Sequence, residues 1–426
     1  MKNVLRSGTA ALVTGALLAG CATQPEPVAT QAPAPVETKT PDILDRQPAS
    51  PPAGIFRPDV PAPAPLPEPG QAAPPLMRPH PPQGQTRVLE LLPPTLTRDR
   101  KAWAGDIAAA FTALRLAPTD RNFCAVIGVI EQESGFEADP VVPGLSRIAW
   151  REIETRRQRY GIPKLALDAA LSKTSPNGQT YKRRLDTLRT ERQMSALYDD
   201  MIAELPGGSL LLSGYNPVRT GGPMQVSIAF AEAHARETSS RTVVDGDVRR
   251  AVFTRRGGVY FGVAHLLDYP APYSTPLYRF ADFNAGHYSS RNAAFQRAVA
   301  RLTKKPLVLD GDLLRYDNGR PSANPSATQK AVLALSKRLK LDADDINAGL
   351  RQEKTDAFAR TPVYQRVFSL ADRTSGGRAP REAMPRIDLK SPKIQRKLTT
   401  EWFAKRVNMR YGNCMTRAAR GAGTTN

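Results

Sequence analysis

Apolar residues follow a helical spacing through most of the chain from residue 97 onward. Residues 97–114 carry an apolar stripe with a period of three to four residues, which predicts an amphipathic helix. Phe123–Ile130 is apolar on nearly every side, which indicates a helix buried in the core. Gly135 stands at the stop position of this second helix. Glu133 is therefore expected where a buried helix meets a loop.

The same spacing, together with the turn residues between segments, predicts the rest of the fold. Short strands are expected at Leu210–Ser213 and within residues 305–316, and Phe283–Gly286 is expected to form a turn. Further helices are predicted over Ile148–Tyr160, Lys164–Ser172, Tyr181–Leu205, Ser227–Ala235, Asp247–Phe253, Gly257–Leu267, Asn292–Leu302, residues 325–370 and Ile394–Asn408. The predicted fold class is therefore mainly α, with little β.

The first residues have the pattern of a targeting segment. Two basic residues precede the apolar run Ala10–Ala19, which is too short to span a bilayer as a permanent helix. The run leads into Leu18-Ala19-Gly20-Cys21, which resembles the bacterial lipobox. The resemblance implies that residues 1–20 are removed as a signal peptide and that Cys21 is lipidated. The alternative is an ordinary secretory signal that happens to contain a cysteine.

Residues 21–86 are predicted to be an extended linker. Residues 22–82 contain 19 of the 39 prolines, and such a composition cannot bury enough apolar surface to fold. Ala22 follows the lipidation site where an Asp would stand in inner-membrane lipoproteins. By resemblance to Gram-negative sorting rules, this favours an outer-membrane anchor that faces the periplasm. The composition is also compatible with an unspecific disordered tail.

Charge is the next feature that narrows the function. Lys and Arg total 60 against 40 for Asp and Glu, and residues 373–420 hold 13 basic and 3 acidic side chains. A basic end suits an acidic partner. An exported protein rarely meets nucleic acid, so anionic lipid or an acidic wall polymer is the expected partner of this region. The alternative is a solvated basic tail without a specific partner.

Cysteine and histidine are too sparse to predict a metal site. With Cys21 lipidated, Cys124 and Cys414 remain. An exported compartment permits a disulfide between them, and the alternative is two buried thiols. The four histidines are scattered, and no spacing indicates zinc. We therefore expect neither a metal nor another cofactor.

Three short motifs follow one another along the chain: Glu133-Ser134, Gly222-Pro223-Met224-Gln225, and Phe283-Asn284-Ala285-Gly286. Each alone is weak, since helix ends and loops of this kind are common. In this order, behind a lipoprotein-type N-terminus, they resemble the signature of lysozyme-like lytic transglycosylases (the SLT type). These enzymes cleave the glycan of the bacterial cell wall. The general layout is also similar to an uncharacterised class of bacterial lipoproteins.

The resemblance implies an α+β lysozyme-like fold with a helical cleft. The cleft domain would span residues 97–305, with a long helical insertion at about 145–210. Residues 306–426, a helical and basic C-terminal region, are not explained by it. In this family a single Glu protonates the leaving oxygen, then acts as base while the sugar's own 6-hydroxyl attacks. Cleavage of the MurNAc–GlcNAc bond then leaves 1,6-anhydro ends.

The resemblance also assigns roles residue by residue. Glu133 would be the acid and base, and burial among apolar neighbours would keep it protonated near neutral pH. The glycan site would be shaped by Ser134, Met224, Gln225, Phe283 and Asn284.

The chain departs from the family pattern at two motif positions. Pro223 replaces the usual Leu, and Phe283 replaces the usual Tyr and lacks its hydroxyl. Tyr288 is the candidate to supply that hydroxyl. Asp139 is a candidate second carboxylate of the lysozyme type, whereas Glu131 is expected to point away from Glu133.

Two function classes remain open from the sequence. The first is a peptidoglycan lytic transglycosylase. The second is a degenerate lysozyme-like module that binds peptidoglycan or a wall-synthesis partner without cleaving it, which the Phe283 departure and the long insertion motivate. A hydrolytic muramidase is a weaker variant of the first class.

Overall fold

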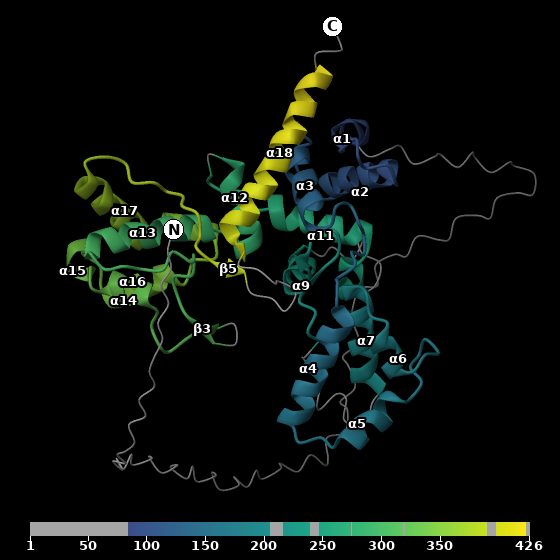
Figure 1. The fold of residues 1–426 in the computed structure, drawn as a ribbon. Helices are drawn as coiled ribbons and strands as arrows, with labels where there is room; N and C mark the ends of the chain where they lie inside the picture. Colours follow the sequence, from purple (N-terminus) through teal and green to yellow (C-terminus); the bar gives the residue numbers. More distant parts are fainter. Residues whose placement is uncertain are drawn as a thin grey trace, which may run out of the picture. The chain divides into compact units, whose positions relative to one another are not determined.

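Helices form almost all of the regular structure (Figure 1). The computed structural model describes residues 84–204, 216–238, 247–273, 275–317, 320–389 and 398–422, within a compact unit that begins at Met77. In these ranges the strands are two residues long and pair as three antiparallel hairpins. The predicted mainly α class is confirmed. The expected signal peptide, Cys21 and the strand at Leu210–Ser213 lie outside the described residues.

Helix α3 (Asp120–Glu133) is buried from Phe123 to Ile130, as its sequence predicts. Thr119 caps it, because the Thr119 hydroxyl accepts a hydrogen bond from the Asn122 amide at 3.2 Å. The helix packs against α1 (Gln85–Leu91), α11 (Arg255–Leu267) and α18 (Thr400–Ala422). Helix α2 (Arg100–Ala113) lies where the apolar stripe predicts it and packs against α1 and α11.

The predicted insertion consists of α4 (Leu145–Arg159), α5 (Lys164–Leu171), α6 (Tyr181–Asp186) and α7 (Glu191–Glu204). The prediction of one helix over Tyr181–Leu205 was wrong, because a capping box starts a new helix at Thr190. The Thr190 hydroxyl accepts from the Gln193 amide at 3.3 Å, while the Gln193 side chain accepts from the Thr190 amide at 3.2 Å. Two amides at the start of α7 thereby gain partners.

The middle of the chain is organised around α11. It is preceded by the hairpin β1 (Thr220–Gly221) and β2 (Val226–Ser227), then by α9 (Ile228–Glu237) and α10 (Val248–Val252). It is followed by α12 (Pro276–Ala285) and α13 (Ser289–Thr303). Buried residues occupy nearly every position from Gly257 to Leu266 of α11. Such a helix can hold neighbours on all of its sides.

A second hydrophobic cluster forms around α13, separate from the cluster that contains α3 and α11. Its elements are the hairpin β3 (Tyr316–Asp317) and β4 (Arg320–Pro321), α14 (Ala327–Leu333), α15 (Ser336–Leu339), α16 (Ala343–Leu350), the short 3₁₀ helix η2 (Asp356–Arg360) and α17 (Pro362–Ser375). The hairpin expected within residues 305–316 therefore begins only at Tyr316. After the hairpin β5 (Asp388–Leu389) and β6 (Leu398–Thr399), the chain enters α18.

Helix α18 returns to the first cluster and packs against α3, α12 and α1 (Figure 1). The expected helix Ile394–Asn408 instead covers Thr400–Ala422. Gly128 of α3 permits a close crossing, since a Cβ there would lie 3.2 Å from the Tyr411 amide nitrogen of α18. A disulfide joins Cys124 of α3 to Cys414 of α18, with 5.4 Å between their Cα atoms. The basic C-terminal segment is therefore partly a core element.

Not all cations of this segment face solvent. Arg410 pairs with Glu131 at 3.8 Å, and Arg417 Nε donates to the Leu91 carbonyl at 3.0 Å. Lys405, Arg406 and Arg420 remain exposed. Within the described ranges, no helix combines the length and apolar character needed to span a membrane.

Candidate functional site

Glu133 is the last residue of α3 and is half-buried, directly after eight buried positions and two half-buried ones. Ser134 closes the helix, since its hydroxyl donates to the Ile130 carbonyl at 3.2 Å. The Gly135 amide donates to the same carbonyl at 3.1 Å, with Gly135 at φ 60°. The left-handed conformation suits glycine, so the sequence Glu-Ser-Gly stops the helix and leaves the carboxylate at its end.

Two neighbouring carboxylates, Glu131 and Asp139, are paired with arginines. Glu131 pairs with Arg410 of α18 at 3.8 Å. Asp139 accepts from the Thr190 hydroxyl at 3.0 Å and pairs with Arg192 at 2.9 Å. Asp139 thus ties the chain after α3 to the start of α7. The Val142 amide adds a hydrogen bond to the Arg189 carbonyl at 2.8 Å.

A cavity of about 440 Å³ opens beside the end of α3. Its lining includes Glu131, Glu137 and Trp103. Glu133 is not among the lining residues, so this cavity belongs to the Glu131 side of the helix.

The second motif is clamped onto α11 by its glycines. A Cβ at Gly262 would lie 2.3 Å from Met224 Sδ, and one at Gly258 would lie 2.4 Å from Pro223 Cδ. Gly222 has φ 72°, and a Cβ there would meet the Val252 carbonyl oxygen at 2.0 Å. Met224 itself is fully buried. Glycine is therefore required on both sides of this contact, which fixes the turn against the helix.

Gln225 is held in the same turn. Its backbone is in the left-handed region at φ 49°, and its amide donates to the Gly222 carbonyl at 3.1 Å. The side-chain Nε2 donates to the same carbonyl at 3.3 Å, and Oε1 accepts from the Thr220 hydroxyl at 3.3 Å. The side chain is half-buried, and these bonds hold its amide group in place before any ligand binds.

The third motif forms the end of α12. The expectation of a turn at Phe283–Gly286 was wrong for its first three residues, which are helical, and Gly286 at φ 107° ends the helix. The Phe283 ring is buried between His265 and Phe403, with centroids 5.1 and 6.4 Å away. Asn284 is half-buried, and its Oδ1 accepts from the Thr400 hydroxyl of α18 at 2.8 Å.

Asp282, one residue before this motif, was missed by the sequence analysis. It is fully buried and accepts from the Tyr288 and Ser290 amides at 2.8 and 2.7 Å, and from the Tyr273 hydroxyl. Burial raises the pKa of Asp282 to about 6, although these hydrogen bonds favour its charged form. The carboxylate thereby organises the corner between α12 and α13. A single Asp in an amphipathic helix carries no sequence signal of this role.

Tyr288 lies at that corner and is also buried. Its ring contacts Tyr269 edge-on at 5.3 Å, and the Arg291 guanidinium lies 4.2 Å from the ring centroid. Burial raises the pKa of the Tyr288 hydroxyl. The ring therefore serves as packing for the corner in this conformation.

Two histidines connect α11 to this corner. A ring nitrogen of His265 lies 3.2 Å from the Phe283 carbonyl, and one of His287 lies 2.7 Å from the His265 carbonyl. His287 also stacks on Tyr269 with centroids 3.9 Å apart. Burial, followed by the neighbouring His287, lowers the pKa of His265 to about 3, so this imidazole is neutral.

Two of the three motifs are thus held directly on one helix, and the helix that ends at the first motif also packs against it. The second motif packs on Gly258 and Gly262 of α11, the third is bonded to His265 of α11, and α3 with the first motif packs against α11. Glu133, Ser134, Gln225 and Asn284 are half-buried, whereas Met224, Phe283 and Tyr288 are buried. The first four carry polar side chains at half-buried positions, and the last three contribute packing.

No group of three or more His, Cys, Asp or Glu side chains in the described part of the chain could hold a metal ion. Asp310-Gly311-Asp312, which resembles a fragment of a calcium loop, forms a turn with Gly311 at φ 87°.

Residues 96–417 match the model of the family described as "Protein of unknown function (DUF1615)", and the chain belongs to this family. The matching model is not a lysozyme-like one. A relative from Escherichia coli (strain K12), described as "Uncharacterized protein YaiW", is 51% identical over 322 residues. The match covers 76% of this chain and 87% of the relative. No solved structure matches the chain.

Proposed function

We propose that this protein is a peptidoglycan lytic transglycosylase in which Glu133 is the single acid and base. The observation that carries the proposal is that α11 holds the second and third motifs and also packs against α3, the helix that ends at Glu133. Segments that lie far apart in the sequence gain a common support in this way, and hydrogen bonds hold the side chains of Gln225 and Asn284. Preorganised side chains of this kind are what a glycan-cleaving site requires.

The surroundings of Glu133 support a reaction with one carboxylate. Hydrolytic glycosidases use a second carboxylate as nucleophile or base. Of the three nearest candidates in sequence, Glu131 and Asp139 are paired with Arg410 and Arg192, and Glu137 is exposed. A transglycosylase needs no such partner, because the 6-hydroxyl of the MurNAc residue attacks and the product carries a 1,6-anhydro ring.

We also propose that the protein is a lipoprotein anchored through Cys21 in the outer membrane and facing the periplasm. The disulfide between Cys124 and Cys414 supports an oxidising compartment. Labelled palmitate should be incorporated into the wild-type chain in cells and not into Cys21→Ser. Labelling of both would refute the anchor site. The exposed Lys405, Arg406 and Arg420 of α18 are the proposed contact with an anionic lipid or wall polymer.

The test of activity is digestion of purified peptidoglycan, with the fragments read by mass spectrometry. Anhydro-muropeptides should appear with the wild-type protein and disappear with Glu133→Gln. The matched control is Glu137→Gln, which removes an exposed carboxylate four positions further along and should cleave like the wild type. Cleavage that is unchanged by Glu133→Gln would refute the assignment, and reducing ends without anhydro rings would indicate a hydrolase.

The second candidate function is a catalytically inactive module that binds peptidoglycan. It is favoured by Phe283, which lacks the hydroxyl of the usual Tyr and whose ring is buried against His265 and Phe403. Sedimentation of the wild-type protein and of Glu133→Gln with cell walls, without released fragments from either, would support this function over catalysis.

A further inference from the structure

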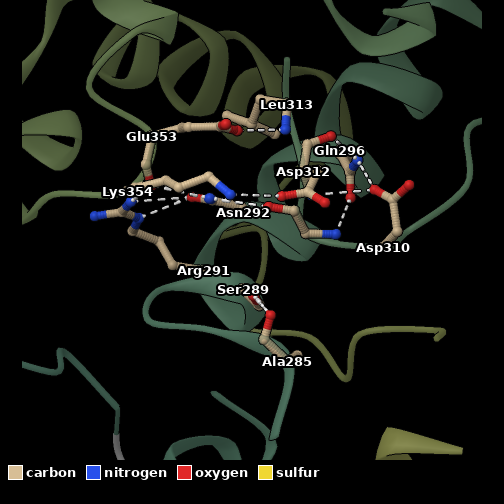
Figure 2. A network of polar contacts seen from close by, with 11 residues as sticks. Ala285, Ser289, Arg291, Asn292, Gln296, Asp310, Asp312, Leu313, Glu353 and Lys354 are labelled. Atoms are coloured by element: carbon tan, nitrogen blue, oxygen red, sulfur yellow. Dashed lines mark hydrogen bonds and ion pairs between the residues drawn. The ribbon is translucent and has the colours of Figure 1, made fainter. Parts of the chain in front are cut away.

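A second polar centre lies in the other hydrophobic cluster. Three polar side chains of α13, Arg291, Asn292 and Gln296, are 1–2% exposed. Figure 2 shows them among the loop that carries Asp310 and Asp312 and the segment that carries Glu353. Burying so many polar groups costs free energy unless each one is hydrogen-bonded. We therefore ask which part of the molecule this network holds in place.

The network holds the loop in one conformation. Asn292 Nδ2 donates to the carbonyls of Gly311 and Glu353, both at 3.0 Å. Gln296 Oε1 accepts from the Gly311 amide at 2.9 Å, and Gln296 Nε2 donates to Asp310 Oδ1 at 2.7 Å. The loop backbone and one oxygen of Asp310 are therefore fixed by buried partners.

This fixed loop forms one wall of a cavity of about 740 Å³, which we call the α13 cavity. Its volume is in the range of small-molecule sites in proteins. The charged lining comprises two anions and two cations, namely Asp310, Asp312, Arg315 and Lys354, and Tyr316 contributes an aromatic ring.

The charges lie in a definite order. Lys354 Nζ pairs with Asp312 Oδ1 at 3.1 Å, and Asp310 lies on the far side of Asp312 from Lys354 in Figure 2. Asp310 Oδ1 accepts from Gln296 and from the Asp312 amide, but Asp310 Oδ2 has no partner among the described residues. One end of the row therefore offers a carboxylate oxygen, and the other end offers an ammonium group.

A buried group beside the cavity also retains unused bonding capacity. Glu353 is fully buried, and its Oε2 accepts from the Leu313 amide. Its Oε1 has no hydrogen-bond partner in the described residues. The carboxyl is linked to the cavity through the hydroxyl of Tyr316, with which it interacts. Burial raises the pKa of Glu353.

We propose that the α13 cavity binds a short peptide that carries both a free amino group and a free carboxylate. The amino group would lie at Asp310, and the carboxylate would lie at Lys354 and Arg315. The choice of peptide rests on the proposed function: the stem peptide of peptidoglycan contains a diamino acid with both groups. The site would then hold the peptide of a wall strand while the α11 motifs act on its glycan.

The test is isothermal titration of the full-length protein with an isolated stem tripeptide that ends in a diamino acid, and with the same peptide acetylated on its free amine. Asp310→Asn is the informative variant, because its side-chain oxygen can still accept from Gln296 and from the Asp312 amide. Asp356→Asn is the matched control, since it removes the same charge from η2, outside the cavity lining. Lys354→Met tests the carboxylate end from a side chain that is 58% exposed, so its folding role is small.

The wild-type protein and Asp356→Asn should bind the tripeptide equally. Asp310→Asn and Lys354→Met should each weaken binding on the order of tenfold or more, the usual loss for a hydrogen bond to a charged group. The acetylated peptide should bind the wild-type protein and Asp310→Asn equally weakly. No binding of the tripeptide by the wild-type protein, or equal loss in all three variants, would overturn the proposal.

Glu133→Gln separates this inference from the proposed function. It should bind the tripeptide like the wild type even if neither protein cleaves peptidoglycan. A failure of cleavage with intact, Asp310-dependent peptide binding would refute the enzyme and leave the cavity assignment standing. Cleavage without peptide binding would support the enzyme and refute the assignment of the cavity.

Discussion

Replacing Gly262 with alanine should destabilise the protein, although alanine is the better helix former. The intrinsic helix preference of alanine over glycine is worth about 1 kcal/mol. At Gly262 the new Cβ would lie 2.3 Å from Met224 Sδ and 2.6 Å from Met224 Cβ, with the Met224 side chain fully buried. Overpacking of a core typically costs about 1–3 kcal/mol. The clash should therefore cancel or exceed the gain.

Gly412→Ala is the matched control. Gly412 lies inside α18, is exposed, and has nothing within 4 Å of its ideal Cβ position. It should stabilise the protein by up to about 1 kcal/mol. The difference between the two variants then isolates the contact with Met224, and we expect it to be about 1–3 kcal/mol. Urea unfolding followed by circular dichroism measures this difference.

The double variant Gly262→Ala with Met224→Ala sharpens the test. Met224→Ala alone should cost about 2–5 kcal/mol because it opens a cavity in the core. In the double variant the methyl group added at position 262 occupies part of that space, so the loss should be smaller than the sum of the single losses. Equal stabilisation by Gly262→Ala and Gly412→Ala, or strict additivity in the double variant, would refute the close packing of the second motif on α11.

The remaining predictions concern the disulfide and two buried titratable groups. Reducing the bond between Cys124 and Cys414, which are 290 residues apart in sequence, should lower the free energy of unfolding by about 6 kcal/mol if the bond acts by chain entropy alone. An unchanged urea midpoint under reductant would contradict this. The pKa of His265 is lowered from 6.5 to about 3, so the neutral imidazole contributes to folding stability above pH 6.5, and this stability is lost as the pH falls toward 3. In that window the free energy of unfolding of the wild type, relative to His265→Gln, should fall by about 1.4 kcal/mol per pH unit. The pKa of Asp282 is raised from 3.8 to about 6, so its protonated carboxyl contributes to folding stability below pH 3.8, and this stability is lost as the pH rises through 6. The stability of the wild type relative to Asp282→Asn should therefore fall as the pH rises from 4 to 6, and matching pH profiles for these two comparisons would show that the titrating groups are misassigned.

The sequence predicted a helix well where both its cap and its apolar pattern were recognisable. Helix α3 begins at Asp120 after the Thr119 cap, and its buried stretch Phe123–Ile130 is the apolar run of the sequence. The break before α7 was also encoded locally, in the capping box of Thr190 and Gln193, but the amphipathic pattern on both sides concealed it. Helix α1 was missed because its seven residues adjoin the Pro-rich segment and are too few to show a period.

The candidate site was predicted in part. The position of Glu133 at the end of a buried helix follows from the order of apolar, polar and glycine residues, which is local information. The supporting residues were not predictable in this way. Asp282 is isolated in its own helix, and its partners Tyr273, Tyr288 and Ser290 reach it only when α12 and α13 form a corner.

The sequence by itself determined the order of the three motifs. It also determined the helical class and the end of α3 at Glu133, because both depend on residues within one or two helical turns. Only the tertiary structure decided that α11 supports the second and third motifs and that α18 returns to α3, where a disulfide joins Cys124 to Cys414. It also decided that Asp139 is engaged by the insertion. These contacts join segments tens to hundreds of residues apart, and no local periodicity or cap records which distant surface a buried side chain meets.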